Sequence, residues 1–169
     1  MTISAPPHAN RSAPILVLVH PGSACGSANY NIGRADAKCG REALALALDE
    51  HAGGVIVIDG ALSDELPDYP DFNGAIDQAL ARARSNGLTS MRVMGCDSEN
   101  FDQTRAIAAV LEDHPALKDH EFIVTGAWYE APTADDAEPG GCVGSVLTAL
   151  ATLGARARVD ESALEMEIA

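Results

Sequence analysis

The sequence predicts a three-layer α/β domain, with a doubly wound, mostly parallel sheet of five to six strands, Rossmann-like in its layering. Two observations favour this fold. Short apolar segments, typical of strands that are buried on both faces, recur along the chain. Longer segments with helical periodicity lie between them, so the strands are joined by helical crossovers as parallel strands require.

The first half of the chain alternates in this way from residue 14 onward. The predicted strands are residues 14–20 (PILVLVH), 55–59 (VIVID) and 90–94 (SMRVM). The predicted helices are residues 34–51, which end before Gly53-Gly54, and residues 72–85, which end before Asn86-Gly87. Residues 61–71 are rich in Pro and Asp and are predicted to form a loop.

The second half continues the same alternation. Asn100 is the expected N-cap of a helix that runs to about residue 113. A strand at 121–125 (EFIVT), a helix at 142–153 closed by Gly154, and a short strand at 155–159 follow, with a turn-rich loop at 131–141. We therefore expect a flexible N-terminal tail over residues 1–13 and a single α/β domain over residues 14–169.

Composition restricts the classes of function. The 169 residues are 47% hydrophobic but only 4% aromatic, so we expect a core of Ala, Val, Leu and Ile. The net charge of −14 disfavours nucleic-acid binding, and no apolar segment is long enough to cross a membrane. Because the sequence shows no signal-peptide pattern, we expect a cytoplasmic protein whose cysteines are free thiols. The four cysteines contain no CxxC pair, so we expect no structural zinc, and we expect no cofactor.

Candidate site residues follow the predicted strands, at the edge where this fold class places ligands. The small residues after the first strand could present backbone N–H groups to an anion, although the segment PGSACGS matches neither GxxxxGK[ST] nor GxGxxG. More ordinary roles remain open for each residue, such as a hydrogen-bonded His ending a strand or an Asp in a turn. The candidates are His20, Gly22, Ser23, Cys25, Gly26, Ser27, Asp59, Cys96, Asp97, Trp128, Tyr129, Gly141 and Cys142.

Cys142 is the strongest candidate for a reactive group. It follows Gly140-Gly141 and is expected to open a helix, where the positive end of the helix dipole would lower the pKa of its thiol. The glycines would let a carbonyl substrate approach, and neighbouring N–H groups could stabilise an oxyanion. The alternative is that a small residue is needed here for close packing.

Residues 122–163 (FIVTGAWYEAPTADDAEPGGCVGSVLTALATLGARARVDESA) resemble the C-terminal part of the isochorismatase-like cysteine hydrolases. Thr125-Gly126, Cys142-Val143 and Gly154 fit the outline of that family, and residues 98–111 (SENFDQTRAIAAVL) resemble its Ser-x-Phe-x-x-Thr stretch. The resemblance implies that Cys142 is a nucleophile assisted by an Asp and a Lys. Here His20 occupies the position of the Asp, and Gly95 or Cys96 falls where the Lys would be.

Three functions are compatible with these residues. In the first, Cys142 attacks a small amide, imide or ester and His20 acts as the general base. In the second, the same scaffold is a non-catalytic module that binds a small molecule or anion, or that self-assembles. In the third, some combination of His20, Cys25, Asp59, Cys96 and Cys142 binds a metal ion, which their spacing does not support. We expect a small-molecule ligand as partner, with a homo-oligomer as the default assembly.

Overall fold

The computed structural model describes residues 13–21, 34–60, 70–95 and 102–165 of the chain. Its elements follow in the order β1 (Ile15–Val19), α1 (Arg34–Glu50), β2 (Gly54–Asp59), α2 (Pro70–Ser85), β3 (Ser90–Met94), α3 (Gln103–Asp113), the 3₁₀ helix η3 (Pro115–Asp119), β4 (Glu121–Tyr129), α4 (Gly141–Thr152), β5 (Arg156–Val159) and β6 (Leu164–Glu165). The sequence-based alternation of strands and helices is confirmed in type and order. The short η3 and the two-residue β6 are additions to it.

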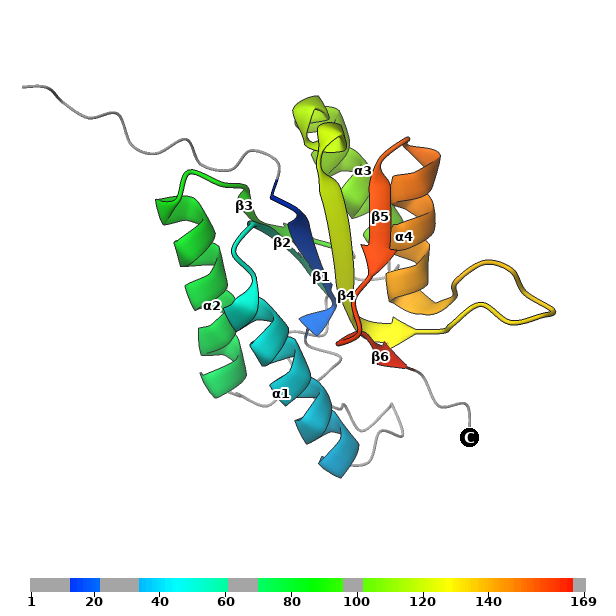
Figure 1. The fold of residues 1–169 in the computed structure, drawn as a ribbon, viewed down its shortest axis with the longest axis horizontal. Coiled ribbons are helices and arrows are strands. Elements are labelled where there is room, and N and C mark those ends of the chain that lie inside the picture. The colour runs from blue at the N-terminus through cyan, green and yellow to red at the C-terminus, as the bar shows by residue number, and fades with distance from the viewer. Residues whose placement is uncertain (1–12, 22–33, 61–69, 96–101, 166–169) are drawn as a thin grey trace, which may run out of the picture.

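The sheet is parallel, with the strand order β3-β2-β1-β4-β5, and β6 pairs with the far end of β4. The strand β1 lies at its centre, where Val17 pairs with Ile56 of β2 on one side and with Val124 of β4 on the other. Every residue of β1 and of β2 is buried, which explains why both segments are apolar without alternation. The predicted doubly wound α/β fold is therefore confirmed (Figure 1).

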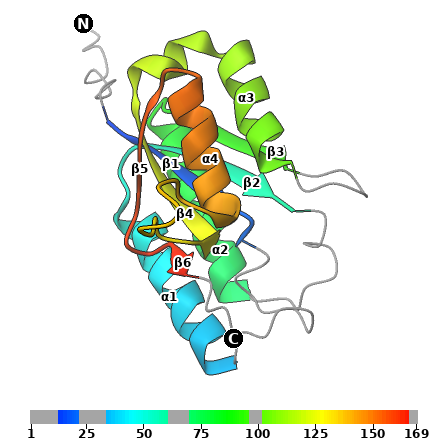
Figure 2. The same ribbon diagram turned by 90° about the vertical axis from the view of Figure 1, so that its right-hand side faces the viewer.

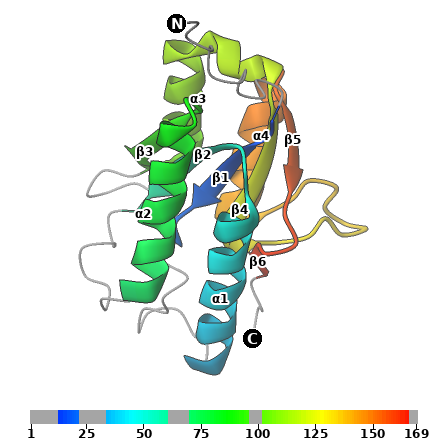
Figure 3. The same cartoon turned by 60° about the vertical axis from the view of Figure 1, so that its left-hand side comes forward.

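Helices cover both faces of the sheet, as Figures 2 and 3 show from two sides. The helices α1 and α2 lie on one face, where Leu44 and Leu48 pack with Leu16 and Leu18 of β1. The helices α3 and α4 cover the other face. Burial of these two apolar clusters provides the main stabilising free energy of such a fold.

Two predicted boundaries are wrong: the N-cap of α3 is Asp102 instead of Asn100, and β4 ends at Tyr129 instead of residue 125. The helix α3 begins at Gln103 rather than beside Asn100, and its N-cap is Asp102, whose carboxylate accepts hydrogen bonds from the backbone N–H of Arg105 (2.9 Å) and from Thr104 Oγ1 (2.7 Å). The predicted cap, Asn100, lies outside the described residues.

The strand β4 does not end at residue 125 but continues to Tyr129. Its Gly126 has a φ of 131° and pairs with Val19, whose carbonyl oxygen would lie only 2.1 Å from a Cβ at residue 126. Glycine therefore permits a close strand contact here instead of ending the strand. Beyond it, β4 gains a new neighbour, because Ala127 pairs with Leu164 of β6.

Candidate functional site

The sheet reverses its winding direction at the carboxyl ends of β1 and β4. The connection from β1 leads through α1 to β2 on one side, whereas β4 lies on the other side of β1 and continues through α4 to β5. In a doubly wound sheet, crossovers diverge at this point and leave room for a ligand. The residues that follow β1 and β3 and those that open α3 and α4 define the candidate site.

His20 directly follows β1 and is held in an unusual conformation. Its φ of 46° lies in the left-handed region, its backbone N–H donates to Ile58 O at 2.8 Å, and only 1% of its surface is exposed. Burial lowers the pKa of its imidazole, and the negative charge of Asp59 opposes this effect only in part. His20 is therefore mostly neutral at pH 7 and offers an uncharged imidazole at the strand end.

Gly95 joins three parts of the site. Its N–H donates to Asp59 O (2.7 Å) at the end of β2, and its carbonyl accepts from the N–H of Asp102 (2.6 Å) at the start of α3. A Cβ at residue 95 would lie 3.2 Å from Nε2 of His20 and 2.5 Å from a methyl group of Ile58. The imidazole of His20 thus lies against the backbone that leads from β3 to α3, and residue 95 has no room for a side chain.

Gln103 is a site residue that the sequence reasoning missed. It opens α3 and shares the buried stripe of Ile107, Val110 and Leu111, so it lies on the sheet-facing side of the helix. Only 7% of the residue is exposed, and its Oε1 accepts no hydrogen bond from any residue that the structure describes. A buried amide oxygen without a donor is costly, which makes it a candidate ligand-binding group.

Cys142 is the second residue of α4, as predicted, but its environment is not the expected one. The thiol is free and half-buried, and it packs against the apolar cluster that contains Val143 and Val146. Burial raises the pKa of the Cys142 thiol, whereas the helix position had suggested a lowered pKa. Cys142 is therefore protonated at neutral pH.

Asp59 ends β2 and is already paired. Only 6% of it is exposed, and the guanidinium of Arg92 on β3 binds its carboxylate with two hydrogen bonds, of 2.5 and 3.1 Å. This pairing raises the pKa of Arg92. Arg92 also lies 3.6 Å from Asp77 of α2. The negative charge of Asp59 is therefore balanced within the protein rather than offered to a ligand.

The remaining predicted site residues fall into two groups. Tyr129 is the last residue of β4 and is half-buried against the core, and Trp128 lies beside it within the strand instead of after it. Gly141 opens α4 with a φ of 71°. The other group lies outside the described residues: Gly22, Ser23, Cys25, Gly26, Ser27, Cys96 and Asp97.

Within the described ranges, no group of three His, Cys, Asp or Glu side chains is arranged to hold a metal ion. None of the helices in those ranges is both long enough and apolar enough to cross a bilayer.

Comparisons with known proteins add no family to this description. The chain matches no protein-family model, and searches of curated proteins and of solved structures likewise find no match.

Proposed function

We propose that the carboxyl edge of the sheet binds a small, uncharged polar molecule of the amide or imide class. Gln103 is the observation that carries this proposal, because its buried Oε1 lacks a donor among the described residues. An N–H group of the ligand would supply that donor and would remove the cost of the unsatisfied oxygen.

The charges around the site support an uncharged ligand. His20 is neutral at pH 7 because burial lowers its pKa, and Asp59 is neutralised by Arg92. A ligand with both an N–H donor and a carbonyl acceptor would complement an amide oxygen and an imidazole ring. Small-molecule sites commonly combine a few such polar groups with an apolar wall.

The test is a binding screen with two matched variants. Small amides, imides and esters are added to the full chain, and binding is followed by ligand-observed NMR and by thermal shift. Gln103→Leu is expected to abolish binding, while Gln78→Leu on the exposed side of α2 makes the same change away from the site and should bind as the wild type does. Equal binding by both variants, or no binding by the wild type, would refute the proposal.

Hydrolysis by Cys142 is the second candidate function. The observation in its favour is His20, whose imidazole is neutral and can therefore accept a proton. His20 lies at the same edge of the sheet as the start of α4, which carries Cys142. Because Cys142 is a protonated thiol, it would need this base to remove its proton during attack on a carbonyl carbon.

The Cys142→Ala variant distinguishes the two functions, and cysteine-by-cysteine alkylation as a function of pH, read by mass spectrometry, tests the protonated thiol that both assume. In both cases Cys142 alkylates with an apparent pKa above the ordinary thiol value of about 8.5. For a binding site alone, Cys142→Ala leaves ligand binding intact and the wild type releases no product. For a hydrolase, Cys142→Ala abolishes the release of product from the amides or esters that bind, and His20→Asn slows it.

A further inference from the structure

A groove of about 320 Å³ runs along one flank of α1. One wall is the second half of this helix with the residue that follows it, residues 43–51, and the other wall is residues 160–162, which follow β5. Leu16 of β1 and Ile123 of β4 are almost fully buried and form the floor. This α1 groove shares no residue with the candidate site at the carboxyl edge of the sheet.

The helix wall of the α1 groove is an apolar stripe. Ala43, Leu46 and Ala47 line it at spacings of three and four residues, so they share one face of α1. The side chains that α1 packs against the sheet are different ones, Leu44 and Leu48. The helix therefore has a second apolar face, on which 56% of Leu46 is exposed.

The rim of the α1 groove is negatively charged. Glu50, Asp160 and Glu161 line it, and no Lys or Arg of the described residues does. His51 also lines the groove and is mostly neutral at pH 7, because burial lowers the pKa of its imidazole. A segment that complements the groove would therefore bring positive charge together with apolar side chains.

The arginines on the neighbouring elements do not offset this charge. Arg82 of α2 lies 3.7 Å from Asp49, and Arg158 of β5 lies 3.2 Å from Glu121. With Arg156, at the far end of β5, also counted, the carboxylates around the groove remain in excess.

The segment that precedes the described residues has the complementary composition. Residues 1–12 (MTISAPPHANRS) contain no Asp or Glu, although the whole chain has 25 of them. They include the cation Arg11 and the apolar residues Met1 and Ile3, besides alanines and prolines. Both features required by the groove are thus present in one short segment.

This segment is also attached to the chain at the groove. The carbonyl oxygen of Pro14 lies within hydrogen-bond reach of the His51 imidazole, and Leu16 belongs to the floor. Tethering through so short a link gives an effective concentration on the order of millimolar, so weak contacts suffice for docking.

We propose that residues 1–12 fold back along the α1 groove, with Arg11 at the acidic rim and apolar side chains of the segment against Leu46. Arg11 precedes Pro14 by three residues, a distance of roughly 10 Å in an extended chain. Its long side chain then reaches the carboxylate of Glu50, which directly precedes His51. Docking would cover the exposed Leu46 and would balance part of the negative charge of the rim.

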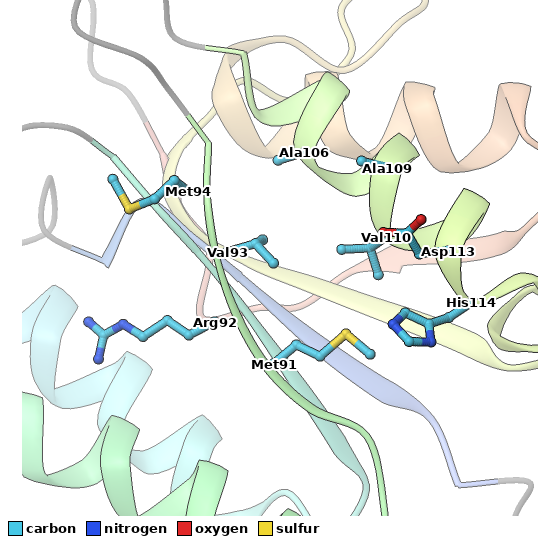
Figure 4. A pocket seen from close by; sticks show the side chains of 9 residues that line it. All are labelled: Met91, Arg92, Val93, Met94, Ala106, Ala109, Val110, Asp113 and His114. Atoms are coloured by element: carbon cyan, nitrogen blue, oxygen red, sulfur yellow. The ribbon is translucent and has the colours of Figure 1, made fainter.

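The first test is the rate at which trypsin cleaves after Arg11 in the folded full chain, followed by mass spectrometry. Leu46→Asp should raise this rate at least about fivefold, because a docked segment is cleaved only when it opens. Met94→Asp makes the same change at the other exposed large hydrophobic residue, on β3 (Figure 4), and should leave the rate unchanged. Cleavage after Arg84, at the exposed end of α2, reports general unfolding and should not change in either variant. Equal rates in all three proteins, or equal effects of the two substitutions, would overturn the proposal.

The second test examines the charges by NMR of the backbone amides. Arg11→Glu should shift the signals of Ala47 and Ser162 in the groove, and Glu161→Lys in the same chain should return them toward their wild-type positions. Arg84→Glu makes the same change of charge at the end of α2 and should leave these signals in place. Groove signals that ignore Arg11→Glu, or that shift with protein concentration because another copy fills the groove, would contradict docking within one chain.

Discussion

Replacing Gln103 by Leu should stabilise the protein while removing its proposed ligand-binding group. Only 7% of Gln103 is exposed, and its Oε1 has no hydrogen-bond donor among the described residues. An unsatisfied buried polar group costs about 1–3 kcal/mol in folding free energy. Leu has a similar size and would extend the apolar stripe of Ile107 and Leu111 by one turn.

The expected gain in the free energy of unfolding is therefore about 1–2 kcal/mol, after allowance for imperfect packing of the new side chain. For a chain of this size, each kcal/mol corresponds to an increase in Tm of about 2–4 °C. Urea unfolding is the assay, and the midpoint should rise while the slope stays constant.

Two variants control this measurement. Gln78→Leu, at an exposed position of α2, should change stability by no more than about 0.5 kcal/mol. Gln103→Glu places a carboxylate in the same buried position and should destabilise the fold. If Gln103→Leu instead lowers stability by more than about 1 kcal/mol, the amide makes a hydrogen bond in solution and the reasoning about the site fails.

Three further predictions concern Gly126, the two buried histidines and Asp59. Gly126→Ala should lower the free energy of unfolding, measured with urea, by at least about 3 kcal/mol, because its Cβ would lie 2.1 Å from Val19 O. A decrease of less than about 1 kcal/mol would contradict so close an approach of β4 to β1. Burial lowers the pKa values of His20 and His51, so the unfolded chain takes up protons before the native state does. The two histidines therefore contribute stability that is present above pH 6.5 and is lost as the pH falls through their native pKa values. Urea unfolding measured from pH 7.5 to 5 should show this loss, and His20→Asn should make the free energy of unfolding depend less on pH. Asp59→Asn should lower the pKa of His20 further, which NMR titration of the imidazole would detect, since the charge of Asp59 now raises it.

The elements of the fold were predictable from the sequence because each has a strong local signal. The strands β1 and β2 are buried on both faces and therefore consist of uninterrupted Ile, Val and Leu over most of their length. The extension of β4 beyond residue 125 was not predictable in this way, because a Gly after an apolar run weakens the local signal for a strand. Its continuation depends on contacts of Gly126 with β1 and of Ala127 with β6, which are distant in sequence.

The candidate site was predictable in position but only partly in chemistry. His20 and Asp59 were identified because the carboxyl ends of parallel strands meet at one edge. Gln103 was missed because one polar residue at the start of an apolar stripe looks like an ordinary helix end, and its burial depends on the packing of α3. For Cys142, the sequence revealed the helix start but not the apolar surroundings that raise the thiol pKa.

The two edges of the sheet carry similar charged side chains. The strand β5 carries Arg156 and Arg158, which are both exposed, and Arg158 pairs with Glu121 of β4. The strand β3 carries Arg92, which keeps 46% of its side chain exposed while it pairs with Asp59 and Asp77. Figure 4 shows the Arg92 side chain directed away from the groove between β3 and α3. Because exposed charges on an edge strand disfavour pairing with another chain, the ion pair that neutralises the acid at the end of β2 also leaves a protecting charge on β3.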